Sequence, residues 1–336
     1  MGYEMLTRTG KNFWEMTSVM QNAIRKGDYE IAGYAMWELL PKYGNYLRKR
    51  LLVISAEDCY GVLTKELLPL MDMATQESFE KALSILCAAK KNRDADYFVC
   101  NLMVNDTPSG LDKHELSKKL ARAIIKKRII EAGRLSAELF KTDRKLMWKM
   151  LNEITGLHRP HLIAEVQALE TSNKNMTKPA EETIFVAKAM VLFWTEKPTK
   201  DRLLAYDGMR FDGVMDYQSI RIKKSLDDCE KVEGLFPEWA YNWHTVYGKY
   251  KLRRDAVHAI ESDQRLLTPL EINLFDDCTW NRDINECLKK WNPRNRHIPY
   301  DDGKFTVEMK FPVSEEDGGA EASDDEESFE QMTLPI

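Results

Sequence analysis

Few residues of the chain stand at spacings that support catalysis or metal binding. His158 and His161 flank an Arg-Pro dipeptide, and the Asp-Asp pairs at 276–277 and 301–302 could each offer oxygen ligands to Mg²⁺. The histidines have no acidic cluster nearby in sequence, and the aspartate pairs lack a third ligand. The phosphate-cradling glycine loop, the hydrolase nucleophile elbow and the HExxH zinc motif do not occur. We therefore expect no catalytic residue, no cofactor and no metal site.

The residues best suited to another kind of chemistry are basic, because Lys and Arg side chains bind the phosphates of nucleic acids. Four basic clusters stand at expected helix ends or on expected polar faces. They are Arg25 and Lys26; Arg48, Lys49 and Arg50; Lys90, Lys91 and Arg93; and Lys118, Lys119, Arg122, Lys126 and Lys127, followed by Arg128. Acidic residues are interspersed among them, so solvated helix faces explain these clusters as well as contact with DNA does.

The charge of the chain is divided between a mildly basic part and a strongly acidic one. The net charge is −5, yet the segment 313–330 alone contains nine acidic residues and no basic one, which leaves residues 1–312 at +4. A small, polar and acidic composition predicts a disordered tail over 313–336. A mildly basic remainder is compatible with a nucleic-acid partner but does not require one.

The last six residues, Gln331-Met-Thr-Leu-Pro-Ile336, resemble the bacterial sliding-clamp-binding hexapeptide, Q-x-x-L-x-[FLI]. The resemblance implies that the Gln331 amide bonds to backbone beside the clamp pocket and that Leu334 and Ile336 fill two apolar subsites. Met332 would contact the rim, and Pro335 completes the motif. Two alternatives stay open: a terminus without function, or a mimic of the acidic tip of single-stranded-DNA-binding protein.

Three segments of the first third of the chain follow a recognisable order. They are Ala23-Ile-Arg-Lys-Gly-Asp28, Arg48-Lys-Arg-Leu-Leu-Val-Ile-Ser-Ala-Glu-Asp-Cys-Tyr-Gly61, and Lys90-Lys-Asn-Arg-Asp-Ala-Asp-Tyr97. The order resembles the C-terminal helical domain of the MgsA/RarA replication-associated AAA+ proteins. The chain departs from that pattern at Ala56, where Ser is usual, and at Lys90, where Pro is usual.

This resemblance covers about a quarter of the chain and does not extend to an ATPase module. It implies a helical domain that mediates subunit association, in the manner of a clamp-loader collar, or that docks onto a related AAA+ protein. It also implies that Glu57 and Asp58 are capping or ion-pairing groups rather than catalysts.

Apolar periodicity predicts an all-α fold. The expected helices lie at 13–26, 28–41, 46–55, 62–73, 79–91, 94–104, 112–133, 145–155, 162–171, 181–195, 219–232 and 255–266, with a break at 105–110. These helices suggest four regions: a MgsA/RarA-like bundle at 10–106, a second helical region at 111–196, a mixed irregular region at 197–312 and the acidic tail at 313–336.

The composition favours a cytoplasmic protein. No run approaches the twenty apolar residues that a membrane span requires, and the first residues lack a signal-peptide pattern. The six cysteines form no C-x-x-C pair, which is typical of reduced, buried thiols.

The leading hypothesis is a non-enzymatic accessory protein of DNA replication or recombination, from a bacterium or a phage. It would assemble through its helical bundle and reach the replisome through the sliding clamp. A regulator that co-assembles with a host AAA+ protein or occupies the host clamp is the alternative. An enzyme acting on nucleic acids, with a site that the sequence does not reveal, is the third.

Overall fold

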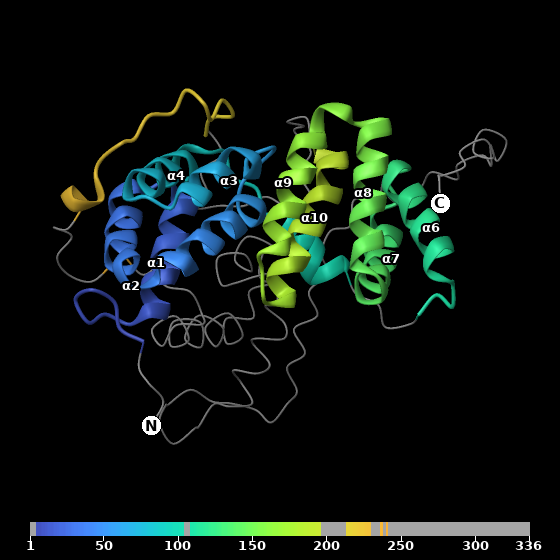
Figure 1. Ribbon diagram of the computed structural model, residues 1–336, viewed down its shortest axis with the longest axis horizontal. Coiled ribbons are helices and arrows are strands. Elements are labelled where there is room, and N and C mark those ends of the chain that lie inside the picture. The colour runs from blue at the N-terminus through green and yellow to red at the C-terminus, as the bar shows by residue number, and fades with distance from the viewer. Residues whose placement is uncertain (1–4, 104–107, 196–212, 230–235, 238–239, 241–336) are drawn as a thin grey trace, which may run out of the picture.

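The structure is a computed structural model, and it describes residues 5–103, 108–195, 213–229, 236, 237 and 240 (Figure 1). Within these residues the fold is all-α, as the sequence predicts. The α-helices are α1 (Phe13–Lys26), α2 (Tyr29–Glu57), α3 (Thr64–Met73), α4 (Gln76–Ala88), α5 (Asp94–Tyr97), α6 (Lys113–Ile125), α7 (Ile129–Thr142), α8 (Arg144–His158), α9 (Ile163–Lys174) and α10 (Pro179–Thr195). A π-helical turn η1 (Phe98–Leu102) and 3₁₀ turns η2 (Pro160–Leu162) and η3 (Leu226–Cys229) complete the set.

Helix α1 begins and ends, and α2 begins, where the sequence predicts. The side chain of Asn12 accepts hydrogen bonds from the backbone N–H groups of Trp14 and Glu15, which caps α1. Gly27 ends α1 with a φ of 73°, a conformation that glycine adopts without steric cost. The Asp28 carboxylate then accepts from the N–H of Ile31 and starts α2. The short loop therefore sets α1 directly against α2.

The helix end expected at 41 and the helix start expected at 46 are wrong. The helices expected at 28–41 and 46–55 are one helix, α2, which continues through Pro41 and bends at Tyr43, where φ is −126° and ψ is 26°. Proline removes one backbone hydrogen bond and crowds the preceding turn, so it can bend a helix without ending it. Tertiary packing keeps the second half of α2 on the same core.

The single helix expected over 112–133 is instead two helices, α6 and α7. The N–H of Arg128 bonds to the carbonyl of Ala123, and that of Lys127 bonds to the carbonyl of Ile124. This is a Schellman motif, in which Lys127 takes the left-handed conformation at a φ of 56°. The chain therefore turns at 126–128, and Ile130, in the first turn of α7, is 43% exposed.

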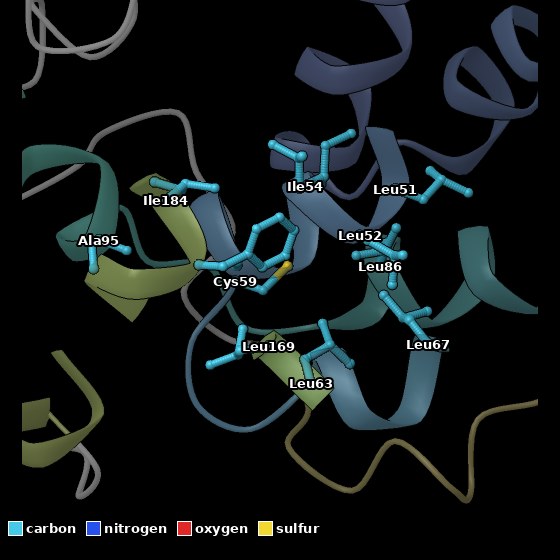
Figure 2. Packing of buried hydrophobic residues seen from close by; sticks show 14 of the residues in the cluster. Leu51, Leu52, Ile54, Cys59, Leu63, Leu67, Leu86, Ala95, Leu169 and Ile184 are labelled. Carbon is cyan, nitrogen blue, oxygen red and sulfur yellow. The ribbon is translucent and has the colours of Figure 1, made fainter. Parts of the chain in front are cut away.

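One hydrophobic core extends through all ten α-helices. α10 packs against α2 and α5 as well as against α9, while α9 packs against α3. Figure 2 shows Leu169 of α9 and Ile184 of α10 beside Ile54 of α2 and beside Cys59 and Leu63, which connect α2 to α3. The regions predicted at 10–106 and 111–196 therefore share a core.

The segment 213–229 crosses over the first helices beside α4 (Figure 1). Its backbone pairs with the end of α4, since the N–H of Val214 bonds to the carbonyl of Ala88. Leu226 and Cys229 are buried in the common core. The helix expected at 219–232 is wrong over the described part, which forms only the short turn η3.

No helix in the described part of the chain combines the length and the apolar character that crossing a membrane requires.

Candidate functional site

The structure divides the predicted basic clusters into an interior set and a surface set. Arg25, Lys91 and Arg93 are 6%, 1% and 1% exposed. The prediction that these three side chains contact phosphates is therefore wrong, because their polar groups point into the protein and already have protein partners. The sequence could not separate them from surface residues, since a buried and a solvated arginine look alike at a helix end.

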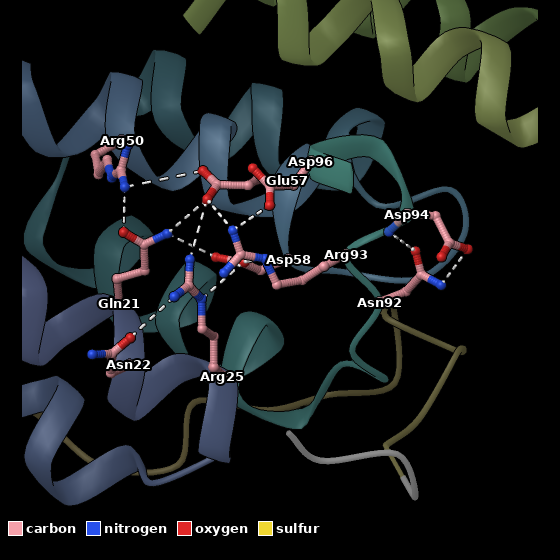
Figure 3. Close-up of polar contacts among 10 residues, drawn as sticks. All are labelled: Gln21, Asn22, Arg25, Arg50, Glu57, Asp58, Asn92, Arg93, Asp94 and Asp96. Atoms are coloured by element: carbon pink, nitrogen blue, oxygen red, sulfur yellow. Dashed lines mark hydrogen bonds and ion pairs between the residues drawn. The ribbon is translucent and has the colours of Figure 1, made fainter. Parts of the chain in front are cut away.

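Arg25, in the last turn of α1, binds two carboxylates at the end of α2 (Figure 3). Its Nε lies 2.9 Å from Oδ1 of Asp58, and its Nη2 lies 3.1 Å from Oε1 of Glu57. Gln21, one turn earlier, donates from Nε2 to the same two carboxylates at 3.2 and 3.0 Å. These contacts join the ends of α1 and α2.

Arg93 completes the network from the chain that leads into α5. Its Nη2 lies 3.4 Å from Oε1 of Glu57 and 2.5 Å from Oδ2 of Asp96, and its Nε lies 3.6 Å from Oδ1 of Asp58. Arg50 stands at the margin, where its Nη2 is 4.0 Å from Oε2 of Glu57 and also donates to Gln21. Glu57 and Asp58 are thus ion-pairing groups, as expected.

We name these residues the buried charge network: Gln21, Arg25, Arg50, Glu57, Asp58, Arg93 and Asp96 (Figure 3). It contains three cationic and three anionic side chains, so its formal charges cancel. A buried charge is tolerated when it is paired and hydrogen-bonded. The network occupies the positions on which the MgsA/RarA resemblance rests, and what it does here is fasten α1, α2 and α5 together.

The remaining basic residues of the first helices also have local roles. Lys91 donates from Nζ to the carbonyls of Ala89, at 2.8 Å, and Leu86, which caps the end of α4. The Lys90 Nζ lies 5.5 Å from the centre of the Tyr60 ring. Arg48 donates from Nε to the carbonyl of Met71 at 2.6 Å. These contacts are intramolecular.

Lys26 and Lys49 complete these clusters. Lys26 is exposed and Lys49 is half-buried. Arg25, the other base of the predicted set in α1, is buried, so Lys26 is the exposed member of that pair.

The last predicted cluster lies wholly on the surface. We name it the α6 basic face, and all six of its side chains are exposed: Lys118, Lys119, Arg122, Lys126, Lys127 and Arg128. Its outward orientation confirms the helical pattern of the sequence, in which Leu116, Leu120, Ala123 and Ile124 turn inward. This is the predicted cluster that the structure places where a phosphate backbone can reach it.

The neighbourhood of the α6 basic face strengthens its charge. Residues 108–150 contain twelve Lys and Arg and five Asp and Glu, and all twelve basic side chains are exposed. Glu131 lies 3.9 Å from Lys119 and 3.4 Å from Arg128, which neutralises part of the face. The excess is seven positive charges over 43 residues, and exposed charge of one sign attracts polyanions.

A second buried pair was not singled out from the sequence. The Glu165 carboxylate, on α9, accepts from the N–H groups of Thr64 and Lys65 at 3.0 and 2.9 Å, and so caps α3 from 100 residues away. The Lys188 Nζ, on α10, donates to the carbonyl of Cys59 at 2.5 Å. The residue before α3 is Leu63, whose apolar side chain cannot accept these hydrogen bonds, so Glu165 does so instead. In the sequence, the only sign of this pair was one acid and one base on otherwise apolar helix faces.

Burial governs the ionisation of this pair. It raises the pKa of Glu165 above its ordinary value, against the two N–H bonds and the charge of Lys188, which favour the carboxylate. Burial also lowers the pKa of Lys188, against the charge of Glu165. Both groups are structural, since each bonds to backbone that it holds in place.

The thiols in the described core are poor nucleophiles. Burial raises the pKa of Cys59 to about 11, that of Cys87 to about 12 and that of Cys229 to about 11. Because the thiolate is the reactive form, these three cysteines are chemically inert at neutral pH. The prediction of buried, reduced thiols is confirmed for them.

Within the described ranges, no group of three or more His, Cys, Asp and Glu side chains is placed to hold a metal ion. His158 and His161 belong to those ranges. The aspartate pairs at 276–277 and 301–302 and the hexapeptide residues Gln331, Met332, Leu334, Pro335 and Ile336 lie outside them.

Comparison with protein-family models, with curated proteins and with solved structures finds no match to this chain. The MgsA/RarA resemblance therefore depends on the sequence pattern alone.

Proposed function

We propose that the chain is an accessory protein of DNA replication or recombination that acts by binding DNA and other proteins rather than by catalysis. The observation that carries the proposal is the α6 basic face, with its excess of exposed positive charge. Phosphate contacts need cationic side chains along a surface and carry no demand for a catalytic group.

The spacing on the α6 basic face suits a phosphate backbone. Lys118, Arg122 and Lys126 follow one another at four-residue intervals, so they rise along one side of the helix by about 6 Å per step. A row of cations along one side of a helix can contact successive phosphates of one DNA strand. Lys127 and Arg128 extend the charge beyond the helix end, where the chain turns.

The protein-binding part of the proposal is supported by sequence features. The MgsA/RarA-like order in the first third supports self-association or docking on an AAA+ relative. The hexapeptide at 331–336 supports recruitment by a sliding clamp, for which a single peptide of micromolar affinity supplies roughly 8 kcal/mol. A ring with several identical sites would strengthen that attachment.

The DNA arm of the proposal is tested by the salt dependence of binding to forked duplex DNA, measured by fluorescence anisotropy with the full chain. Replacing Lys118, Lys126 and Lys127 by Glu should weaken binding and lower the slope of log K against log salt by about 2 to 3, since each phosphate contact contributes about 0.9. The matched control replaces Lys141, Lys145 and Lys149, which carry the same charge on α7 and α8. A flat salt response of the unaltered chain contradicts the DNA arm.

The clamp arm is tested by retention of the full chain on an immobilised bacterial sliding clamp. Replacing Gln331 and Leu334 by Ala should abolish retention, because the amide and the main apolar contact are both removed. Replacing Thr333 by Ala, inside the same hexapeptide, is the control. Equal retention of all three proteins ends the clamp hypothesis.

A further inference from the structure

Among the described residues, the positive charge of the protein is concentrated in one place. Residues 5–103 have one more basic than acidic residue, 151–195 have one fewer, and 213–229 are balanced. The excess of seven lies in 108–150, all of it on exposed side chains. A polyanion that approaches this part of the molecule is therefore drawn to the α6–α8 end.

Three side chains of the α6 basic face lack an anionic neighbour within the described structure. Lys118, Lys126 and Lys127 have no described carboxylate within 4.0 Å, whereas Glu131 approaches Lys119 and Arg128. The carboxylate of Asp143 is occupied by Lys113 at 3.0 Å. The face therefore has charge that local acids leave uncompensated.

The same chain contains a segment of complementary charge. Residues 313–330 have nine acids and no base, and four of the acids are consecutive, from Asp324 to Glu327. In an extended chain alternate side chains are about 6.5 to 7 Å apart, close to the rise of about 6 Å between Lys118, Arg122 and Lys126 on the helix. Two acids on one side of an extended segment, such as Asp324 and Glu326, can therefore meet two successive bases of the helix.

The covalent connection makes this encounter intramolecular. Roughly 70 residues separate Ala240 from Val313, a length that could span more than 200 Å if extended, so reach does not limit contact. A tethered ligand acts at an effective concentration set by its linker, which is millimolar for short flexible linkers and falls as the linker lengthens. Weak ion pairs then suffice to keep a face occupied.

We propose that the acidic segment 313–330 docks on the α6 basic face of its own chain and competes there with DNA. The docking itself follows from the charges of the two segments. The competition rests on the proposed function, because it takes DNA as the other occupant. In this arrangement the hexapeptide at 331–336 follows directly after the docked segment.

The docking is tested without DNA by zero-length carbodiimide cross-linking of the full chain, with the linked peptides of the monomer identified by mass spectrometry. We expect carboxylates of 315–330 to be linked to Lys118, Lys126 or Lys127, and these links to disappear at high salt. Links found equally on Lys141, Lys145 and Lys149, links found only in dimers, or no links from the segment would each overturn the proposal.

A charge exchange makes the assignment specific. Replacing Lys118, Lys126 and Lys127 by Glu should abolish the links. Adding Asp324→Lys, Asp325→Lys and Glu326→Lys to that variant should restore them with the roles of amine and carboxylate reversed. The control adds the same three tail substitutions to the chain with Glu at 141, 145 and 149. Restoration in the control but not in the exchange variant contradicts docking on α6.

The competition is tested by DNA affinity. Replacing the nine acids of 313–330 by Gln and Asn should tighten DNA binding about tenfold, which corresponds to about one-tenth of the unaltered molecules having an open face. The gain should vanish when Lys118, Lys126 and Lys127 are Glu. An equal gain in both backgrounds indicates repulsion at a distance and overturns the competition. Links without any DNA binding would support docking and contradict the proposed function instead.

Discussion

Arg25 of α1 and Arg93, which precedes α5, both pair with the carboxylates of Glu57 and Asp58. Asp58 is fully buried and lies 2.9 Å from Arg25 and 3.6 Å from Arg93. Two buried guanidinium groups thus share one aspartate. The stability of the helix junction depends on this residue more than on any exposed ion pair nearby.

Replacing Asp58 by Ala should lower the free energy of unfolding by about 3 to 5 kcal/mol, because it leaves buried positive charge uncompensated. The control is Asp72→Ala. Asp72 also pairs with an arginine, Arg48, at 3.5 Å, but its side chain is 64% exposed, so the loss should be at most about 1 kcal/mol. Urea unfolding of the two variants decides the matter, and similar losses would contradict a structural role for the network.

Glu165 offers a prediction with a pH dependence. Its pKa is raised in the folded protein, mainly by burial. At a pH between the pKa of the unfolded state and that of the folded state, Glu165 is therefore protonated in the folded protein and ionised in the unfolded chain. Lowering the pH through this window should therefore stabilise the unaltered protein relative to Glu165→Gln, which cannot titrate. Unfolding free energies of both proteins between pH 7 and pH 4.5 test this. A constant or opposite difference would contradict a raised pKa.

The MgsA/RarA resemblance implied that Glu57 and Asp58 are capping or ion-pairing groups, but it did not give their partners. Arg25 and Lys26 are adjacent bases at one helix end, yet the first is buried and the second exposed. Arg25 is buried because it pairs with the end of α2, and its partner Glu57 lies 32 residues further along the chain. Contacts of this range depend on the packing angle of two helices, which charge spacing does not contain.

At the scale of elements, the turn between α6 and α7 combines a helix end with surface charge. Lys127 holds a left-handed conformation that usually belongs to glycine and costs other residues about 1 to 2 kcal/mol. The chain thus has a lysine at a position where glycine would make the folded protein more stable. This lysine is one of the three cations of the α6 basic face that have no carboxylate within 4.0 Å in the described part of the chain.

Replacing Lys127 by Gly should raise the free energy of unfolding by about 1 kcal/mol, since it relieves the left-handed strain. Lys126→Gly is the matched control. Lys126 has an ordinary φ of −82°, so glycine there should lower stability by about 0.5 to 1 kcal/mol. Thermal unfolding of the two variants should thus shift in opposite directions. A shift in the same direction would contradict the Schellman geometry.

Helix ends that are marked by a typical capping residue were predictable from the sequence, and helix ends without one were not. Asn12, Gly27 and Asp28 mark helix limits by known chemistry, and the structure uses each of them. Lys126 to Arg128 contains no glycine, so the end of α6 left no sequence signal. At Pro41 the opposite happened: a strong signal for a helix end produced only a bend, because packing of the second half of α2 outweighed it.

At the scale of the whole molecule, the shared core implies that the two helical regions lose their structure together. Phe185 of α10 is fully buried, and α10 contacts α2 and α5 on one side and α9 on the other. Replacing Phe185 by Ala should cost about 3 to 5 kcal/mol. Hydrogen exchange in increasing urea should show residues 13–88 and 113–158 destabilised by equal amounts. Unequal loss would indicate two independent domains.

The segment 213–229, which crosses α4, is synthesised long after the helices that it contacts, and this delay affects folding of the nascent chain. The Tyr29 hydroxyl donates to the carbonyl of Lys224, and the Glu80 carboxylate accepts from the N–H of Leu226. At ribosomal speed about 10 to 40 s pass between the making of residue 29 and that of residue 226. The helices made first therefore wait for chain made much later before their polar groups are satisfied. A nascent chain stalled near residue 200 should remain a substrate for chaperones and proteases.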